Sequence, residues 1–277
     1  MTQPASWSIA AEHAHLASQS LGAAVELLDP AHGLHDIQYR GRSIAAVRAL
    51  LGLSFETRTP LQPELLLEAY ARQGDLVVSY AQSPRRDVAV QAYWRASEFG
   101  SSADPVIDLQ TSVQTALLDS VPSIYTYNVA LAREVWLPRD DQARDWHRPW
   151  QVGDPSFELT DSTSPTCLVL RLADVPPQPT VDRSRSASAA SATRNDGPSP
   201  SLIVMVRPGD LRSGRGIVDP TEPERLAIVC QQLHEHLEKG VIRRVWQRTA
   251  LVDSARDLEI AGELYRSFVD AAPSLTV

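Results

Sequence analysis

Four charged residues in one short, glycine-rich segment have the types and spacing to bind an anion or a sugar. Arg207, Asp210, Arg212 and Arg215 lie in the segment 207–216, directly after the apolar run 202–206. An arginine presents parallel N–H groups, so it can hold a carboxylate, a phosphate or a sugar acid through paired hydrogen bonds. The alternative is an ordinary glycine-rich turn with solvated charges, because most loops carry no binding site.

A second candidate lies in segment 138–165, which has few features of regular structure. It contains Trp146, His147 and Trp150, and Trp136 comes just before it. Indole rings can stack on sugar rings while an imidazole and nearby aspartates bond to sugar hydroxyls. The alternative is that these tryptophans fix a long loop to the core.

The sequence also contains two pairs of histidines with one residue between them. His13 and His15, next to Glu12, would share one face of a strand, as metal ligands or an acid–base pair would. The alternative is two exposed histidines near a chain terminus. His234 and His236 lie in a segment of helical periodicity, where residues two apart do not face each other, so we interpret them as surface residues.

Motifs of high functional specificity are absent from the sequence. There is no phosphate-binding glycine loop with lysine, no dinucleotide-binding glycine fingerprint, no His-Glu-x-x-His and no Gly-x-Ser-x-Gly. No cysteine pair has the spacing of zinc ligands. We therefore predict no metal site and no cofactor. We identify no catalytic residue, and whether the protein is an enzyme stays open.

Bulk composition narrows the classes of partner. The 277 residues carry a formal net charge of −8, which argues against a nucleic-acid partner and against docking on anionic lipid. The sequence shows no secretory signal and no apolar stretch long enough to span a bilayer. Cys167 and Cys230 each lie in an apolar run, which favours two buried, reduced thiols. These features predict a soluble cytoplasmic protein.

Most of the chain has the pattern of antiparallel strands. Three apolar runs between residues 65 and 99 are separated by two groups of turn residues, which predicts a meander. Segment 106–118 alternates apolar and polar residues, and segments 23–28 and 34–40 flank an Asp-Pro…Gly turn. Segment 43–53 fits either a strand or a short helix.

Two helices are predicted near the C-terminus. The first begins at the capping box Thr221–Glu224, continues through apolar residues at helical spacing and ends at Gly240. The second begins near Ser254 and ends before Pro273. The Pro/Ser/Ala-rich segment 174–201 is predicted to be a disordered loop, because it cannot bury enough apolar area to offset its chain entropy. We therefore expect a single domain, 1–277: a large antiparallel β-sandwich, mainly β, with two helices.

Three segments, 74–80, 91–95 and 237–244, resemble a family of uncharacterised bacterial proteins. The succession of long antiparallel strands is similar to that of galactose-mutarotase-like sandwiches, which bind and process carbohydrates. This resemblance implies a sugar or sugar-acid ligand. The mutarotase family uses a histidine and a carboxylate, and neither is matched to a specific position here.

Two functional hypotheses follow. The first is a carbohydrate-binding or carbohydrate-modifying domain, in which the aromatic segment stacks on the sugar and the Arg207–Arg215 loop makes polar contacts. The second is a non-catalytic module for a protein partner. Its contact surface would be the polar sheet face that carries Asp108, Gln110, Ser112, Gln114, Gln91 and Arg95.

Overall fold

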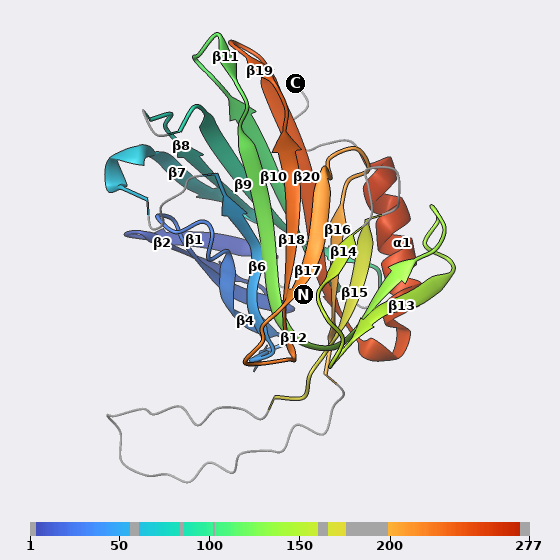
Figure 1. The fold of residues 1–277 in the computed structure, drawn as a ribbon. Coiled ribbons are helices and arrows are strands. Elements are labelled where there is room, and N and C mark those ends of the chain that lie inside the picture. Colours follow the sequence, from blue (N-terminus) through green and yellow to red (C-terminus); the bar gives the residue numbers. More distant parts are fainter. Residues whose placement is uncertain are drawn as a thin grey trace, which may run out of the picture.

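Most of the described chain is β-strand, as predicted (Figure 1). The computed structural model describes residues 4–55, 61–83, 86–101, 103–159, 166–175 and 199–271. Within these residues, 18 strands pair into one continuous network, and two further short strands form a separate ribbon. All pairings between these strands are antiparallel, so the predicted mainly β, antiparallel class is confirmed.

The N-terminal part of the network is a sheet whose outer face is polar. The alternation is clear on β2, where Ala14 and Leu16 are buried and His13 and His15 are exposed. Such alternation is expected of a sheet that covers a core on one side only. The sheet comprises β1 (Ser6–Ala10), β2 (His13–Ala17), β3 (Leu21–Glu26), β4 (Leu34–Tyr39) and the short β5 (Arg42–Ser43).

The second part of the network contains the longest strand, β12, which has 16 residues. Its first half pairs with β6 and β18, while its second half pairs with β13 and β15 of the third part. The sheet order is β6 (Val47–Ser54), β12 (Ser123–Pro138), β18 (Arg225–His234), β17 (Ser213–Val218) and β14 (Phe157–Leu159). The ambiguous segment 43–53 is therefore mainly strand.

The third part contains the predicted meander, which is confirmed as β7, β8 and β9. The last strand of the chain, β20, lies in the middle of this sheet, between β10 and β16. The sheet order is β7 (Leu66–Arg72), β8 (Asp75–Tyr80), β9 (Ala89–Phe99), β10 (Asp104–Gln114), β20 (Ile242–Val252), β16 (Ser201–Val206), β15 (Cys167–Leu172), the second half of β12, and β13 (Trp146–Gln151).

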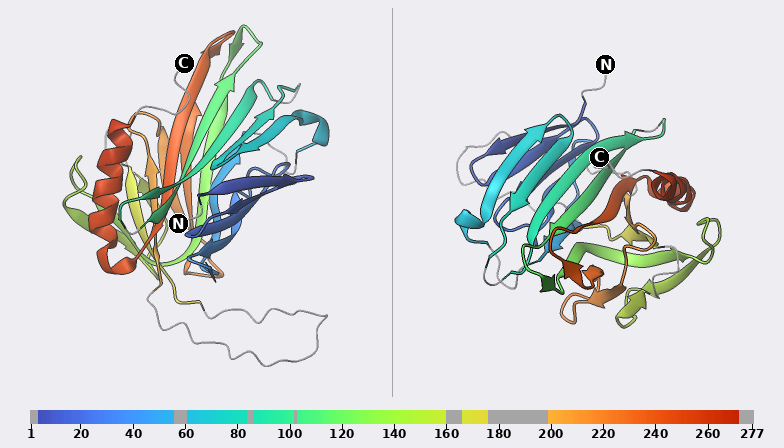
Figure 2. Two further views of the ribbon diagram at one scale, coloured as in Figure 1. Left: turned by 180° about the vertical axis from the view of Figure 1, so that it is seen from behind. Right: turned by 90° about the horizontal axis from the view of Figure 1, so that it is seen from above.

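The three parts curl around one apolar core. The indole N–H of Trp7 on β1 donates to the Gly74 carbonyl in the β7–β8 turn at 3.0 Å, which brings the first strand back to the third sheet. The core between the sheets contains the fully buried Trp94, Trp150 and Tyr80. Figure 2 shows the sheets wrapped about this interior, with the helix outside them.

The helix α1 (Asp257–Asp270) covers the outer face of the third sheet, and it follows the short 3₁₀ turn η2 (Ser254–Arg256). Its apolar stripe buries Ala261, Leu264, Tyr265 and Phe268 against strand residues such as Trp246. Burial of this stripe contributes most of the stability of α1, since an isolated helix of 14 residues is only marginally stable in water. The helix predicted from Ser254 is therefore confirmed.

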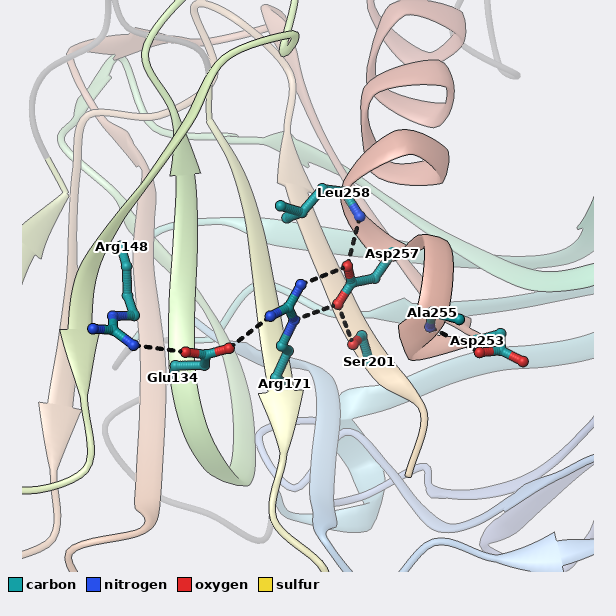
Figure 3. Close-up of polar contacts among 8 residues, drawn as sticks. All are labelled: Glu134, Arg148, Arg171, Ser201, Asp253, Ala255, Asp257 and Leu258. Atoms are coloured by element: carbon teal, nitrogen blue, oxygen red, sulfur yellow. Dashed lines mark hydrogen bonds and ion pairs between the residues drawn. The ribbon is translucent and has the colours of Figure 1, made fainter. Parts of the chain in front are cut away.

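An ion network anchors the beginning of α1 to the sheet (Figure 3). Arg171 on β15 donates to both carboxylate oxygens of Asp257, at 2.8 and 3.1 Å, and to Glu134 on β12 at 2.8 Å. Asp257 also accepts from the Ser201 hydroxyl at 2.7 Å and from the Leu258 backbone N–H at 2.8 Å. Paired contacts of this kind fix geometry as well as adding energy.

The other predicted helix, 221–240, is wrong, because its core is strand β18. Leu226, Ile228 and Cys230 point inward with period two. A register shift opposite Ile124–Tyr125 then changes the phase and turns Leu233 inward. This β-bulge produces a spacing of three residues that imitates helical periodicity. Thr221 bonds to the Asp219 carboxylate in the β17–β18 turn instead of capping a helix.

A small ribbon extends beyond the sheets. It consists of β11 (Asp119–Ser120) and β19 (Leu237–Glu238), and Figure 1 shows it projecting past the neighbouring strands. One further short element, the 3₁₀ turn η1 (Pro63–Leu65), precedes β7. Among the described residues, no helix has the length and apolar character needed to cross a membrane.

The predicted disordered loop, 174–201, falls largely on residues 176–198, which lie outside the described residues. The strands on either side of it, β15 and β16, are direct antiparallel neighbours. The single domain 1–277 stays a prediction.

Candidate functional site

The beginning of the charged segment 207–216 is bound to β20. The Trp246 backbone N–H donates to the Asp210 carboxylate at 2.8 Å, and the Arg207 guanidinium lies over the Trp246 ring, 5.6 Å from its centre. Burial raises the pKa of Asp210 to about 6, against the lowering effects of the Trp246 hydrogen bond and of the nearby arginines. Arg207 and Asp210 therefore hold the segment in place.

Arg212 is also engaged within the protein. It donates to the Glu235 carboxylate at 2.5 Å, and Arg243 on β20 bonds to the same carboxylate. One carboxylate thus balances two guanidinium groups at the end of β18. Of the predicted residues in this segment, Arg207, Asp210 and Arg212 have partners that would have to be displaced by a ligand.

Arg215 is different, because it points outward from β17 between two glycines. Gly214 and Gly216 face inward, where Leu159 and Phe157 of β14 lie against them; a Cβ on Gly216 would come within 2.2 Å of the Phe157 ring. The alternating pattern Gly-Arg-Gly thus lets β14 pack closely while the arginine side chain faces solvent. Among the described residues, Arg215 has no ion-pair partner within 4.0 Å.

Arg215 lines a shallow groove of about 200 Å³ on the outer face of the second sheet, which we call the β17 groove. Its lining residues are Tyr125, Glu158, Ser213, Gly214, Arg215, Val229 and Gln231. A row of hydrogen bonds crosses three strands there: the Ser213 hydroxyl donates to Gln231 at 3.1 Å, and the Gln231 amide donates to the Tyr125 hydroxyl at 3.0 Å. This row holds three polar side chains in fixed positions.

Glu158 supplies the groove with a carboxylate. It is the direct cross-strand neighbour of Arg215, so the two side chains leave the same face of the sheet. Nevertheless, Glu158 takes part in no ion pair within 4.0 Å among the described residues. The groove therefore presents a cation and an anion that both have unused hydrogen-bonding capacity.

The aromatic candidates do not come together with this groove. Trp150 on β13 is fully buried in the core between the sheets, and its indole N–H donates to the Asp154 carbonyl at 3.3 Å. Trp146 packs partly buried against the apolar cluster beneath α1, and His147 is half-buried on the same strand. The two tryptophans thus pack into different clusters, and Trp150 has no exposed surface for stacking.

The polar face of β10 proposed for a protein partner is buried in part. Asp108 and Gln110 are 4% and 1% exposed. Both oxygens of the Asp108 carboxylate accept from Arg248 on β20, at 2.7 and 3.0 Å. The prediction of an open polar surface on this strand is therefore wrong at its centre, because a neighbouring strand supplies the charge that balances it.

Four lining residues of the β17 groove lie outside the predicted segment 207–216: Tyr125, Glu158, Val229 and Gln231. The sequence predicts a helix where β18 lies, so it does not place Gln231 on a sheet face. Glu158 lies on a strand of only three residues, which is too short to show an alternating pattern. The only available signal was the pair of glycines around Arg215, which is typical of close strand packing.

No protein-family model and no curated protein matches the chain. Three solved structures are similar to the chain over most of its length. A candidate mutarotase from Salmonella typhimurium has 8% identity and a TM-score of 0.40 over 90% of this chain and 94% of that one. A candidate aldose 1-epimerase from Klebsiella pneumoniae has 8% identity and a TM-score of 0.46 over 94% and 84%.

The third structure, a GalM/aldose epimerase homologue from C. elegans, has 10% identity and a TM-score of 0.43 over 85% of this chain and 96% of that one. All three printed names are those of mutarotases or aldose epimerases. At these identities and TM-scores, the likeness supports no statement about residues or reaction.

Proposed function

We propose that the protein binds a sugar or a sugar acid in the β17 groove. The observation that carries the proposal concerns Arg215 and Glu158, which are direct cross-strand neighbours at the groove. Neither side chain has an ion-pair partner within 4.0 Å among the described residues. A sugar ring presents both donors and acceptors, and such a ligand is matched by a site that offers both from rigid strands.

The chemistry of the lining favours this class of ligand. The Arg215 guanidinium offers parallel N–H donors that fit a carboxylate, while Glu158 accepts from hydroxyls. Tyr125 contributes an aromatic ring and an already hydrogen-bonded hydroxyl. Because Ser213, Gln231 and Tyr125 are tied to one another, little side-chain freedom is lost when a ligand binds.

Binding is the activity that we propose, and carbohydrate modification is a narrower case of it. Glu158 is the one carboxylate among the groove residues, and it is the residue that would exchange a proton with a sugar hydroxyl. A catalytic role for Glu158 would be seen as accelerated anomer interconversion, measured by polarimetry, that is lost in Glu158→Gln.

The test is isothermal titration calorimetry with matched pairs of neutral and acidic sugars: glucose with glucuronate, and galactose with galacturonate. We expect measurable binding of at least one pair, with the acid bound more tightly. Arg215→Ala should abolish the preference for the acid. Glu158→Gln should increase affinity for the acid, because a like charge near the ligand carboxylate is removed.

The control is Arg225→Ala, which removes an exposed arginine from the adjacent strand β18. Arg225 is paired with Asp219 at 3.5 Å, outside the groove. Its replacement should leave sugar binding unchanged. Equal losses in Arg215→Ala and Arg225→Ala would indicate a general charge effect and would contradict the proposed site, as would the absence of binding by every sugar tested.

A second candidate function, protein interaction, is favoured by the apolar tip at the β11–β19 ribbon. Five of the nine large apolar side chains that are exposed in the described part of the chain lie around it. The most exposed of these five side chains is that of Leu118, at 83%. Contiguous exposed apolar surface is typical of interaction sites. The five residues are Leu117, Leu118, Val121, Val241 and Ile242.

This candidate is tested by light scattering and chemical cross-linking of the wild-type protein and Leu118→Glu. Self-association or partner capture that depends on Leu118 would favour the interaction function. A monodisperse monomer, unchanged by Leu118→Glu and without partner capture, would leave sugar binding as the function to pursue.

A further inference from the structure

One cluster of side chains on the outer face of the N-terminal sheet has no part in the proposed function. Glu26 ends β3, His32 lies in the β3–β4 connection and His35 lies on β4. One ligand atom from each of the three lies within 4.8 Å of the others. The Glu26 carboxylate is 3.4 Å from His32 Nδ1 and 3.8 Å from His35 Nε2.

The backbone that carries His32 is firmly held. The His32 N–H donates to the Asp29 carbonyl at 3.0 Å, and the Leu53 N–H donates to the Pro30 carbonyl at 2.7 Å. Gly33 has φ +67°, and a Cβ on it would lie 2.4 Å from the Leu50 carbonyl oxygen. Because only glycine fits there, the turn is pinned against β6 and the His32 side chain is presented in a fixed place.

The tautomer of His35 follows from its neighbour Asp36. The Asp36 carboxylate lies 3.1 Å from His35 Nδ1, and an ionised carboxylate only accepts, so Nδ1 carries the hydrogen. In the neutral ring, Nε2 then presents a lone pair toward Glu26. This atom is buried and has no hydrogen-bond partner among the described residues.

His35 Nε2 and the Glu26 carboxylate therefore face each other without a donor between them. His35 Nε2 and the Glu26 oxygen are both acceptors, and the 3.8 Å between them is too long for a hydrogen bond. The two imidazole rings lie stacked, with centres 4.5 Å apart and an angle of 16° between their planes. A cation between the three groups would turn each of these contacts into an attractive one.

The distances fit a small metal ion. Nitrogen and oxygen ligands about 2.0–2.2 Å from a tetrahedral Zn²⁺ lie about 3.4 Å from each other. Two of the three observed separations are 3.4 and 3.8 Å, and the third is below 4.8 Å. Because an imidazole lone pair lies in its ring plane, the two stacked rings have to rotate before both nitrogens face one ion. Two imidazoles with one carboxylate suit zinc, whereas calcium and magnesium prefer oxygen ligands alone.

From this geometry we infer that Glu26, His32 and His35 form a zinc site with three protein ligands and an open fourth position. Asp36 is a positioning residue that orients His35. Asp36 also lines an adjacent groove of about 310 Å³ together with His15 and Gln38.

The experiment uses the full chain without an affinity tag, stripped of metal by chelation and titrated with Zn²⁺ by calorimetry at pH 7.5. We expect one Zn²⁺ per chain. Glu26→Gln, His32→Ala and His35→Ala should each bind roughly 100-fold more weakly or not at all. Co²⁺ titration provides a second readout, since ligation by this set should give visible absorption bands that the variants lack.

The matched control is His236→Ala. His236 is an exposed histidine with a carboxylate partner, Asp119, at 2.8 Å, but it belongs to no group of three possible metal ligands in the described part of the chain. Zinc binding should be unchanged in this variant. Circular dichroism should show the same fold for all variants in the absence of metal, since none of the three ligand side chains is fully buried.

Two results would overturn the inference. The first is the absence of stoichiometric Zn²⁺ or Co²⁺ binding to the correctly folded wild-type chain. The second is wild-type affinity in the variant that lacks all three ligands. Neither outcome depends on sugar binding in the β17 groove, because the two sites share no residue.

Discussion

Two polar clusters of the molecule are built from similar groups but differ in how completely those groups are satisfied. In the first, Arg171 and Asp257 join α1 to the third sheet, and the carboxylate of Asp257 accepts four hydrogen bonds. In the second, Glu26, His32 and His35 converge on the N-terminal sheet with acceptors facing each other. The first cluster has no capacity left for a ligand, whereas the second has.

This difference separates structural polar clusters from candidate functional ones. A buried charge that is fully bonded holds two elements together, and its loss leaves the partner charge uncompensated. A cluster with converging, unused lone pairs gains most from an added cation. The β17 groove resembles the second kind, since Arg215 and Glu158 keep free hydrogen-bonding capacity beside a tied row of neutral side chains.

The largest effect is expected from breaking the satisfied cluster. Arg171→Ala leaves Asp257, only 2% exposed, without its guanidinium partner. We expect the free energy of unfolding to fall by about 3–5 kcal/mol, measured by urea denaturation followed by circular dichroism. The α1 helix should also lose protection from hydrogen exchange ahead of the sheets.

The control is Arg256→Ala at the same end of α1. Arg256 pairs with Glu259 at 2.6 Å, but both side chains are more than half exposed. Exposed pairs contribute little to stability, so this variant should unfold almost as the wild type does. Similar destabilisation by the two substitutions would remove the distinction between the buried and the exposed pair.

An intermediate effect is expected at Asp210, which has one backbone hydrogen bond and arginines nearby. Its pKa is raised from 3.8 to about 6, so the folded state binds the proton more tightly than the unfolded state does. The stabilising contribution of the protonated group is therefore present below about pH 4 and lost as the pH rises through 6. The loss amounts to about 2–3 kcal/mol.

The measurement compares Asp210→Asn with the wild type by urea denaturation between pH 4 and pH 7. Asparagine can still accept from the Trp246 N–H but does not ionise in this range. The wild type should lose more stability than the variant as the pH rises. Parallel pH profiles of the two proteins would contradict the raised pKa.

The smallest effect is expected in the second cluster, which consists of Glu26, His32 and His35. Asp36→Asn removes the carboxylate that fixes the His35 tautomer but leaves all three proposed ligands in place. We expect Zn²⁺ affinity to fall by about 10–100-fold, measured by competition with a chromogenic chelator. Glu12→Gln, which removes an exposed charge near the same sheet, should leave affinity unchanged.

The strands could be predicted where local pattern and tertiary structure agree. The meander and α1 were predicted because turn residues and apolar periodicity mark them without reference to the rest of the chain. Strand β18 was mistaken for a helix because a bulge altered its alternation. The burial of Asp108 could not be foreseen either, since its partner Arg248 comes from the far end of the sequence.

The candidate sites depended still more on tertiary structure. Arg215 was predicted, but its neighbours in the groove come from three other strands. The zinc ligands lie within ten residues of one another, yet Glu26, His32 and His35 match no familiar spacing. They converge because Gly33 turns the chain and because a register shift, with Asp36 at positive φ, reorients β4.

The central position of β20 also has a consequence for biosynthesis. Asp108 on β10 and Arg248 on β20 are 140 residues apart, yet they pair side by side in the finished sheet. While the chain emerges from the ribosome, β10 and β16 are synthesised before β20. The edges of these two apolar strands that later pair with β20 therefore stay unpaired until the end of synthesis. Such late, long-range closure makes folding slow and exposes the nascent chain to aggregation, so this protein is expected to be a natural client for chaperones.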